Sequence, residues 1–450
     1  MPDRALVVLD QVSCSALDHE LGLRGLPLSH PVMLDYVPRT TPVGHATIST
    51  GVPPSTHRVQ GRTWYEHGPL SLLKHEIGHA VTHRRPVPPD PLHVIGASNL
   101  AGRLRGDGMA SIVAVAAKDF IPFLFGAWDC DVVVYPFDVM PGRLPGGGLG
   151  LSIVFVAWTS AGHGALSGAW PAIAAQLAAM APVGATTSTP APAALTSLPH
   201  VHVATWQLPA SWGTAKLSYA PHWRTYLMAS ANMLDDGYTD IAQRLLARLP
   251  QPRAHLQSCF STDAYGHASG PGMPDHVGSV ARGVARALRL AGKGYKVGVT
   301  SDHGGRLTPN VAAYDPAAAT IAGTALPVGH HYKDGDHVVG YSFAPGRAPS
   351  GPPRFWVSTP AGLAPFTVPS HMTVRSYHAQ QRPAWKVSGD LSTRVAGLAS
   401  RGGGGDHGLC ETGGFVAAID NEVPAWSPNA TSSHLPGRLD DVADWFLGLT

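Results

Sequence analysis

The chain has 450 residues, a formal net charge of +2 with its 24 histidines counted as neutral, and only 14% charged residues. This balanced charge, with no basic run interleaved with aromatic residues, gives no electrostatic case for a nucleic-acid or acidic-membrane partner. The length is that of about two to three average domains, so a large core can be buried.

Neither the cysteines nor the first residues indicate export. The four cysteines are widely spread and include no Cys-x-x-Cys pair, so we expect neither a disulfide framework nor a cysteine zinc site. The chain begins Met-Pro-Asp-Arg and leads directly into an apolar stretch without the features of a signal peptide, which predicts a cytoplasmic protein. The longest apolar region, residues 109–128, is interrupted by charged residues and proline, so no membrane span is expected.

The first predicted strand, residues 5–9, ends at Asp10. About thirty residues later the segment 40–51 reads TTPVGHATISTG and predicts a short helix. Thr41 at its start is a candidate nucleophile, because free N–H groups and the positive end of the helix dipole would face an anionic substrate there. Thr40 is the alternative nucleophile.

Residues 62–100 are rich in His, Pro and Arg and predict an irregular lobe near the site. Within this lobe, His75-Glu76-Ile77-Gly78-His79 matches the helical zinc motif of metalloproteases. A third ligand at the metzincin spacing would fall at Arg85, so we do not favour protease activity.

The middle of the chain continues the alternation of strands and helices. Residues 112–120 predict a strand with Lys118 near its end, and residues 182–200 predict a flexible connector rich in Pro, Thr and Ala. Residues 276–291 predict a helix with an apolar stripe facing the core. The stripe consists of Val277, Val280, Val284, Ala287 and Leu288.

Two further predicted strands, residues 256–262 and 295–301, end at Asp263 and Asp302. Ligands of open α/β sheets gather beyond the carboxyl ends of the strands, so we expect these acids to lie close to Asp10. The sequence therefore predicts an α/β fold with a mostly parallel central sheet and helices on both faces.

Histidines accompany both of these acids. His267 follows Asp263 by four residues, so a loop or first helical turn can present both to one ion, and His303 is adjacent to Asp302. Carboxylates and imidazoles together are suitable ligands for zinc-like ions.

About a hundred residues rich in Pro and Gly separate His303 from His407. We expect residues 305–404 to form an inserted accessory subdomain that returns His407 to the site. The catalytic core would then comprise residues 1–304 and 405–450.

Taken in order, these segments resemble the alkaline phosphatase superfamily, most closely its branch of type I phosphodiesterases, nucleotide pyrophosphatases and single-threonine two-zinc phosphatases. The likeness spans residues 5–410, and each motif is short. The motifs are Val7-Val8-Leu9-Asp10, Thr41 with His45 and Thr50-Gly51, Pro53-Pro54-Ser55-Thr56-His57, Gly61-Arg62-Thr63-Trp64-Tyr65, Ser261-Thr262-Asp263-Ala264-Tyr265-Gly266-His267, Ser301-Asp302-His303-Gly304 and Gly405-Asp406-His407-Gly408.

The resemblance implies an alkaline phosphatase-like fold and two divalent metal ions, expected to be zinc, with manganese or iron as alternatives. It implies one ion held by Asp263, His267 and His407, and a second held by Asp10, Asp302 and His303 with Thr41 beside it. The implied reaction forms a phosphothreonine intermediate, which water then attacks from the opposite side.

Departures from the family pattern bear on the substrate. Arg62 stands where the family has a phosphate-binding asparagine, and Phe120 stands where family monoesterases have the arginine of Lys-Asp-Arg. Lys118 matches the lysine of that motif. Extra cations favour the dianionic group of a monoester, so Lys118 and Arg62 favour monoesters and Phe120 does not. The sequence predicts a slight preference for monoesters; a merely solvated end of the strand is the alternative for Lys118.

The expected function is hydrolysis of a small-molecule phosphate ester, and the oligomeric state is not indicated. Phosphodiesterase or nucleotide pyrophosphatase activity is the first alternative. A degenerate, non-catalytic metal-binding protein is the second, although an intact nucleophile and all six ligands argue against it. Ser350-Gly351-Pro352-Pro353-Arg354 fits the sulfatase modification pattern but lies too late in the chain, and we interpret it as a chance match.

Overall fold

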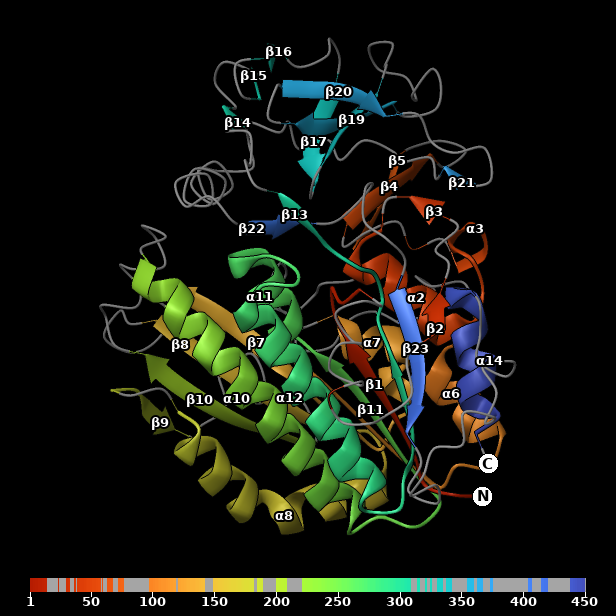
Figure 1. Ribbon diagram of the computed structural model, residues 1–450. Coiled ribbons are helices and arrows are strands. Elements are labelled where there is room, and N and C mark those ends of the chain that lie inside the picture. The colour runs from red at the N-terminus through yellow and green to blue at the C-terminus, as the bar shows by residue number, and fades with distance from the viewer. Residues whose placement is uncertain are drawn as a thin grey trace.

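The computed structural model describes most of the predicted core and part of the predicted insertion (Figure 1). The described residues are 1–13, 23, 30–32, 36–37, 39–57, 59, 63–67, 72–76, 97–118, 120–141, 149–181, 184–188, 200–208, 221–308, 314–315, 320–321, 324–325, 330–334, 337–341, 354–359, 362–366, 373–374, 404–406, 414–419 and 438–449.

A ten-stranded mixed sheet forms the centre of the molecule. Its five central strands are parallel and lie in the order β12 (Lys296–Thr300), β1 (Arg4–Leu9), β11 (Arg253–Cys259), β6 (Ser111–Ala116) and β7 (Val132–Pro141). Antiparallel pairing extends the sheet beyond β7 through β8 (Leu149–Ala157), β10 (Val201–Leu208) and β9 (Thr186–Ser188). On the other side it adds β23 (Gly414–Ile419) and then β2 (His30–Val32). The predicted α/β class with a parallel centre is confirmed; the antiparallel edges were not predicted.

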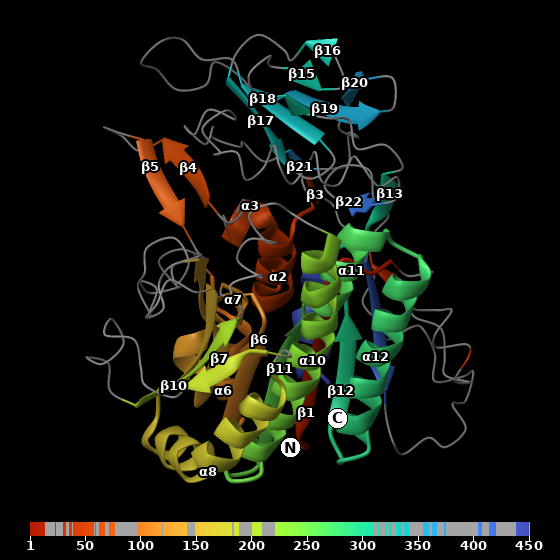
Figure 2. The ribbon, with the colours of Figure 1, turned by 90° about the vertical axis from the view of Figure 1, so that its left-hand side faces the viewer.

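Helices cover both faces of this sheet, which explains why its central strands are almost entirely buried (Figures 1 and 2). All residues of β1 and β6 are buried. One face packs against α8 (Ser160–Ala179), α10 (Pro221–Leu246) and α12 (Pro274–Ala291). The other face packs against α2 (Thr41–Thr50), α6 (Leu100–Gly106), α7 (Ile121–Phe125) and α14 (Val442–Leu447).

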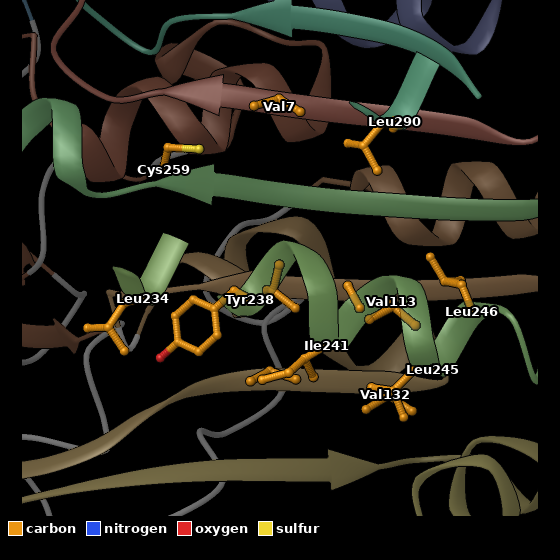
Figure 3. Packing of buried hydrophobic residues seen from close by; sticks show 14 of the residues in the cluster. Val7, Val113, Val132, Leu234, Tyr238, Ile241, Leu245, Leu246, Cys259 and Leu290 are labelled. Atoms are coloured by element: carbon orange, nitrogen blue, oxygen red, sulfur yellow. The ribbon is translucent and has the colours of Figure 1, made fainter. Parts of the chain in front are cut away.

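Alternate residues of β1 divide between the two resulting cores. Val7 belongs to the cluster that contains Tyr238 and Ile241 of α10, seen in Figure 3, whereas Val8 belongs to the cluster on the α2 side. This alternation is the period of two that a strand imposes on its side chains. The first strand is therefore held from both faces, which fixes the position of its last residue and of Asp10 after it.

Four further helical segments with given bounds are described. They are α3 (Pro54–His57), the 3₁₀ turn η1 (Ala127–Asp129), α11 (Ser261–Ser269) and the 3₁₀ turn η4 (Leu439–Asp441). Among the described helices, none has both the length and the apolar character needed to cross a bilayer. Of the four cysteines, the structure describes Cys130 and Cys259, and both are buried free thiols.

The predicted strands at 5–9 and 295–301 are present as β1 and β12, and the strand predicted at 112–120 is present as β6, which ends at Ala116, four residues earlier than predicted. The predicted strand at 256–262 ends too late: β11 stops at Cys259, and α11 begins at Ser261. Asp263 therefore lies in the first turn of a helix, where a carboxylate is favoured by the helix dipole, and not directly after a strand.

The predicted helix at 276–291 is α12. Of its predicted stripe, Val280, Val284 and Ala287 are fully buried, while Val277 and Leu288 are half-buried. The predicted connector at 182–200 contains strand β9, which pairs with β10, so this part is not irregular throughout.

Small sheets lie at the top of both views, away from the ten-stranded sheet (Figures 1 and 2). They pair β13 (Arg306–Thr308) with β22 (Gly404–Asp406), β3 (Tyr36–Val37) with β21 (Thr373–Val374), and β4 (Thr63–His67) with β5 (Leu72–Glu76). The others are the three strands β14 (Tyr314–Asp315), β15 (Thr320–Ile321) and β16 (Thr324–Ala325), and the four strands β17 (His330–Asp334), β18 (His337–Tyr341), β19 (Arg354–Thr359) and β20 (Gly362–Phe366). The boundaries 62–100 and 305–404 stay predictions.

The hairpin of β4 and β5 bears on the metalloprotease motif. His75 and Glu76 lie on strand β5, paired with Trp64 and Thr63, and residues 77–79 lie outside the described residues. A helix is required to bring the two histidines of that motif to one ion, so the strand removes the basis of the protease alternative. Of the sulfatase-like segment, the structure describes only Arg354, at the start of β19.

Candidate active site

The predicted site residues that the structure describes gather beyond the carboxyl ends of the parallel strands. Asp10 directly follows β1, and Asp302 lies two residues after the end of β12. Lys118 comes two residues after β6, and Thr41 is the first residue of α2. This is the edge at which open α/β sheets bind their ligands.

Asp10, Asp302 and His303 form a buried cluster. Each offers a ligand atom within 4.8 Å of the other two, and all three are 0% exposed. His303 Nε2 lies 3.5 Å from Asp10 Oδ1 and 3.4 Å from Asp302 Oδ2. Within the part of the chain that the structure describes, no other three His, Cys, Asp or Glu residues meet this criterion.

The imidazole of His303 is oriented for binding a cation. Its Nδ1 lies 2.8 Å from the carbonyl oxygen of Gly304, to which it can donate, so Nε2 is left with its lone pair facing the two carboxylates. Burial lowers the pKa of His303 to about 4, although Asp10 acts in the opposite direction. The ring is therefore neutral near pH 7, which is the form that binds a metal.

The two carboxylates are also prepared for a cation. Oδ1 of Asp302 accepts from the backbone N–H groups of Gln11 at 3.3 Å and His303 at 3.0 Å, whereas its buried Oδ2 accepts no hydrogen bond within the described residues. Burial raises the pKa of Asp10, and Asp302 raises it further. A divalent cation would use the unsatisfied oxygen and offset the crowding of negative charge, so the residues present fit a metal ion.

Thr41 places its hydroxyl against this cluster. Its Oγ1 donates to Asp10 Oδ1 at 3.3 Å and lies 3.3 Å from Nε2 of His303. Pro42 suits the first turn of α2, where a missing N–H costs nothing. Gly44 allows α2 to approach the Asp302 turn, because a Cβ there would lie 2.5 Å from the carbonyl oxygen of Asp302.

Thr40, the alternative nucleophile, precedes the helix as its N-cap. It has an extended backbone, and its hydroxyl is buried without a hydrogen bond among the described residues. The Thr40 hydroxyl makes no hydrogen bond to the acidic cluster in the described part of the site, whereas that of Thr41 does, so the geometry favours Thr41.

Lys118 bridges the cluster and the second predicted ligand set. Its Nζ lies 2.5 Å from Asp10 Oδ2, 3.1 Å from Asp263 Oδ2 and 3.2 Å from Thr41 Oγ1. Burial would lower the pKa of Lys118, but the Asp10 and Asp263 carboxylates raise it above its ordinary value. Lys118 is therefore a partly buried cation, its side chain 17% exposed, that is paired inside the site and is not a solvated end of the strand.

Asp263 and His267 face each other on α11. Asp263 Oδ1 lies 3.2 Å from His267 Nε2, as expected of residues one helical turn apart. Asp263 is buried, whereas the His267 side chain is 37% exposed. This placement agrees with the prediction that a first helical turn can present Asp263 and His267 to one ion.

Two predicted site residues, Arg62 and His407, lie outside the described residues. The residue before His407 can be placed. Asp406 on β22 is the strand partner of Arg306 on β13, and Arg306 lies three positions after His303 in the sequence. Strand β22, which ends at Asp406, also contacts α11. The chain that leads to His407 therefore returns beside the helix that carries Asp263 and His267.

His45 connects helix α2 to the acidic cluster, which the sequence did not reveal. Its buried Nδ1 lies 2.9 Å from the carbonyl oxygen of Thr41 and 3.1 Å from Asp302 Oδ2. Its Nε2 lies 2.9 Å from Ser258 Oγ on β11. The spacing of four from Thr41 was visible in the sequence, but the partners on β11 and after β12 were not.

Phe120, at the place of the family arginine, belongs to the hydrophobic core on the α2 side and is 6% exposed. It precedes α7 as the N-cap residue. The position therefore supplies packing and no second cation beside Lys118.

No protein-family model and no curated protein matches the chain by sequence. Solved structures do match. A phosphonoacetate hydrolase from Sinorhizobium meliloti 1021, in complex with phosphonoformate, aligns with a TM-score of 0.47 at 14% identity over 100% of this chain and 95% of that one. Murine ectonucleotide pyrophosphatase/phosphodiesterase 5 aligns with a TM-score of 0.44 at 11% identity over 100% of this chain and 95% of that one.

The wild-type alkaline phosphatase PafA aligns with a TM-score of 0.40 at 17% identity over 68% of this chain. The alignment spans 64% of the length of PafA. These structures are of the kinds that the sequence motifs resemble. Because each of the three matches has an identity of 17% or less and a TM-score below 0.5, we infer the function below from the contacts of the site itself.

Proposed function

We propose that this protein is a metal-dependent phosphate ester hydrolase of the alkaline phosphatase superfamily, with Thr41 as its nucleophile. One observation carries the proposal: the hydroxyl of Thr41, at the start of α2, lies against the buried cluster of Asp10, Asp302 and His303 and within 3.2 Å of Lys118 Nζ. A hydroxyl, a cation-binding cluster and a helix N-terminus at one point suit transfer of an anionic phosphoryl group.

Two half-sites would hold the ions. The first consists of Asp10, Asp302 and His303, and the second of Asp263 and His267, with His407 as the further ligand that the family resemblance implies. Bound there, divalent ions such as zinc would withdraw charge from the reacting oxygens and lower the pKa of a hydroxyl beside them.

The chain's own residues account for the remaining steps. Asp10 orients the Thr41 hydroxyl by accepting its hydrogen bond, and Lys118 donates to the same oxygen and favours its deprotonated form. The bond between Thr41 Oγ1 and phosphorus forms as the bond from phosphorus to the leaving alcohol breaks. Water then attacks the phosphothreonine from the side that the alcohol left, which releases phosphate and restores Thr41.

We propose a slight preference for monoesters because Lys118 places one partly buried ammonium group beside the nucleophile. Phe120 offers no second charge, so phosphodiester or nucleotide pyrophosphate hydrolysis is the alternative. A non-catalytic role is disfavoured, since Lys118 and the buried cluster both converge on the Thr41 hydroxyl.

The test measures hydrolysis of a nitrophenyl phosphate monoester and of its bis-nitrophenyl diester by zinc-loaded protein, with a chelated sample as the control. We expect metal-dependent turnover of both esters, faster for the monoester. Faster diester turnover would select the phosphodiesterase alternative. An absence of metal-dependent turnover of either ester would contradict the proposed function.

A further inference from the structure

Gln11, the residue directly after Asp10, has a backbone conformation that its residue type disfavours. Its φ angle is 61°, in the left-handed region, where a residue other than glycine is strained by about 1 kcal/mol or more. A glycine at this position would remove the strain. The side chain is nevertheless 0% exposed and lies inside the site, which calls for a role that a glycine could not fill.

The contacts of Gln11 reach both half-sites. Its backbone N–H donates to Oδ1 of Asp302 at 3.3 Å, in the first half-site. We assign the side-chain amide with its nitrogen toward α11, because in the opposite orientation its oxygen would face only acceptors. So assigned, it donates to the carbonyl oxygen and to Oδ1 of Asp263, both at 3.2 Å, in the second half-site. One residue thus holds a carboxylate of each.

Two glycines leave the space that the Gln11 side chain fills. A Cβ on Gly266, in the middle of α11, would lie 2.6 Å from the end of the Gln11 amide. A Cβ on Gly305 would lie 2.9 Å from Cγ of Gln11. Gly266 therefore lies inside α11 at the point where the helix approaches this amide, although a glycine there lowers helix stability by about 1 kcal/mol relative to alanine.

We propose that Gln11 is a positioning residue that sets the second half-site relative to the first, a role that rests on the proposed two-metal function. The left-handed turn directs the N–H of Gln11 to Asp302 and its amide to Asp263, so the two carboxylates keep one separation before any ion binds. The amide holds Oδ1 of Asp263, the oxygen that lies 3.2 Å from Nε2 of His267, while Oδ2 lies 3.1 Å from Nζ of Lys118. Residues that hydrogen-bond to metal ligands without touching the metal orient those ligands and strengthen metal binding.

The experiment is a calorimetric titration of metal-free protein with Zn²⁺, comparing wild type with Gln11→Met. Methionine keeps the length of the side chain and removes its hydrogen bonds. We expect the wild type to bind two ions. In the variant, we expect one ion to bind as in the wild type and the other about 10- to 100-fold more weakly.

The matched control is Gln243→Met, which removes another buried amide: Gln243 hydrogen-bonds to Nδ1 of His255, away from the site. This variant should bind both ions as the wild type does. If Gln11 had a merely structural role, Gln11→Met would lower the unfolding temperature of the metal-free protein and weaken the binding of both ions. That result would overturn the proposal. Selective loss of one ion is the signature of positioning.

A second variant tests the same contact from the other side. In Gly266→Ala the added methyl group displaces the Gln11 amide while alanine favours the helix, so α11 itself should not unfold. The same selective weakening is expected. If wild type, Gln11→Met and Gly266→Ala all bind two ions equally, the positioning role is wrong even when the enzyme hydrolyses phosphate esters.

Failure of the proposed function gives a different result. A wild type that binds two ions but hydrolyses no phosphate ester would contradict the hydrolase proposal, while selective weakening in Gln11→Met would still support the positioning role. A wild type that binds fewer than two ions would overturn both.

Discussion

Lys118 occupies the point where the negative charges of the site would otherwise face one another. Its Nζ contacts Asp10 at 2.5 Å and Asp263 at 3.1 Å, one carboxylate from each half-site. The same atom lies 3.2 Å from the hydroxyl of Thr41. In the proposed mechanism a single ammonium group therefore has two roles: it offsets the charge of the two carboxylates, and it would donate to a phosphoryl oxygen.

Replacement of Lys118 by methionine tests the second purpose. In metal-loaded protein, we expect kcat/KM for a phosphate monoester to fall about a hundredfold, and for a diester by much less, because the dianion gains more from the ammonium group. The measurement is the ratio of the two rates. Lys293→Met, on the surface, is the control and should leave the ratio unchanged. An equal fall for both esters would mean that Lys118 does not recognise the second charge.

Helix α11 is held at its start by a residue from another helix. The buried carboxylate of Asp235 on α10 accepts from the backbone N–H groups of Phe260 at 3.1 Å and Ser261 at 2.8 Å. Burial raises the pKa of Asp235, while the guanidinium group of Arg286 on α12 and the two N–H groups lower it. Three helices thereby meet where the second half-site begins, so the element that carries Asp263 depends on a contact outside the site.

Removal of this cap should weaken the fold. For Asp235→Asn we expect a loss of about 2 kcal/mol in the free energy of unfolding, because an amide NH₂ group replaces one accepting oxygen and leaves a buried backbone N–H without its acceptor. Denaturant unfolding measures it. Asp240→Asn on the same helix is the control: Asp240 and its partner Arg289 are both exposed, and its replacement should change stability by less than about 1 kcal/mol. Equal losses in the two variants would argue against the capping role.

The whole molecule is organised so that the ends of five parallel strands lie together. Four of these strands could be predicted from the sequence, and β7 was not. The apolar runs before Asp10 and Asp302 mark strands buried on both faces, and a helix start is visible at Thr41. Local pattern was enough because each residue follows its own strand or begins its own helix.

Contacts between distant segments could not be predicted in this way. The N–H of Gln11 meets Asp302, 291 residues away, and the ring of His45 reaches Ser258, 213 residues away. No periodicity in the sequence marks these partners, because the sheet order alone brings β1, β11 and β12 together. The predicted end of β11 was wrong for a related reason. The start of α11 is fixed by Asp235, which belongs to a different helix, so the sequence near residue 260 does not show that the strand has ended.

The stability of the whole molecule should depend on pH through His255. This buried residue lies between Gln243 and Gln257, with its Nδ1 3.0 Å from Nε2 of Gln243 and its Nε2 2.9 Å from Oε1 of Gln257. Burial lowers the pKa of His255 to about 4 from an ordinary value of 6.5. The unfolded chain therefore binds a proton more readily than the folded one between these two values.

Because the folded pKa of His255 is the lower one, its contribution to stability is present above pH 6.5 and is lost as the pH falls toward 4. The loss should be on the order of 3 kcal/mol. We expect His255→Gln, which cannot titrate, to lack this part of the pH dependence. The measurement is the difference in unfolding free energy between variant and wild type at several pH values. A difference that stays constant from neutral to acidic pH would contradict the account.

The most direct test of the central claim is to trap and locate the phosphorylated enzyme. Zinc-loaded protein is mixed with a phosphate monoester, quenched in acid during turnover and mapped by peptide mass spectrometry. We predict phosphate on Thr41, none in a chelated sample, and both the label and turnover lost in Thr41→Ala. Phosphate on Thr40, or turnover that persists in Thr41→Ala, would contradict the assignment of the nucleophile.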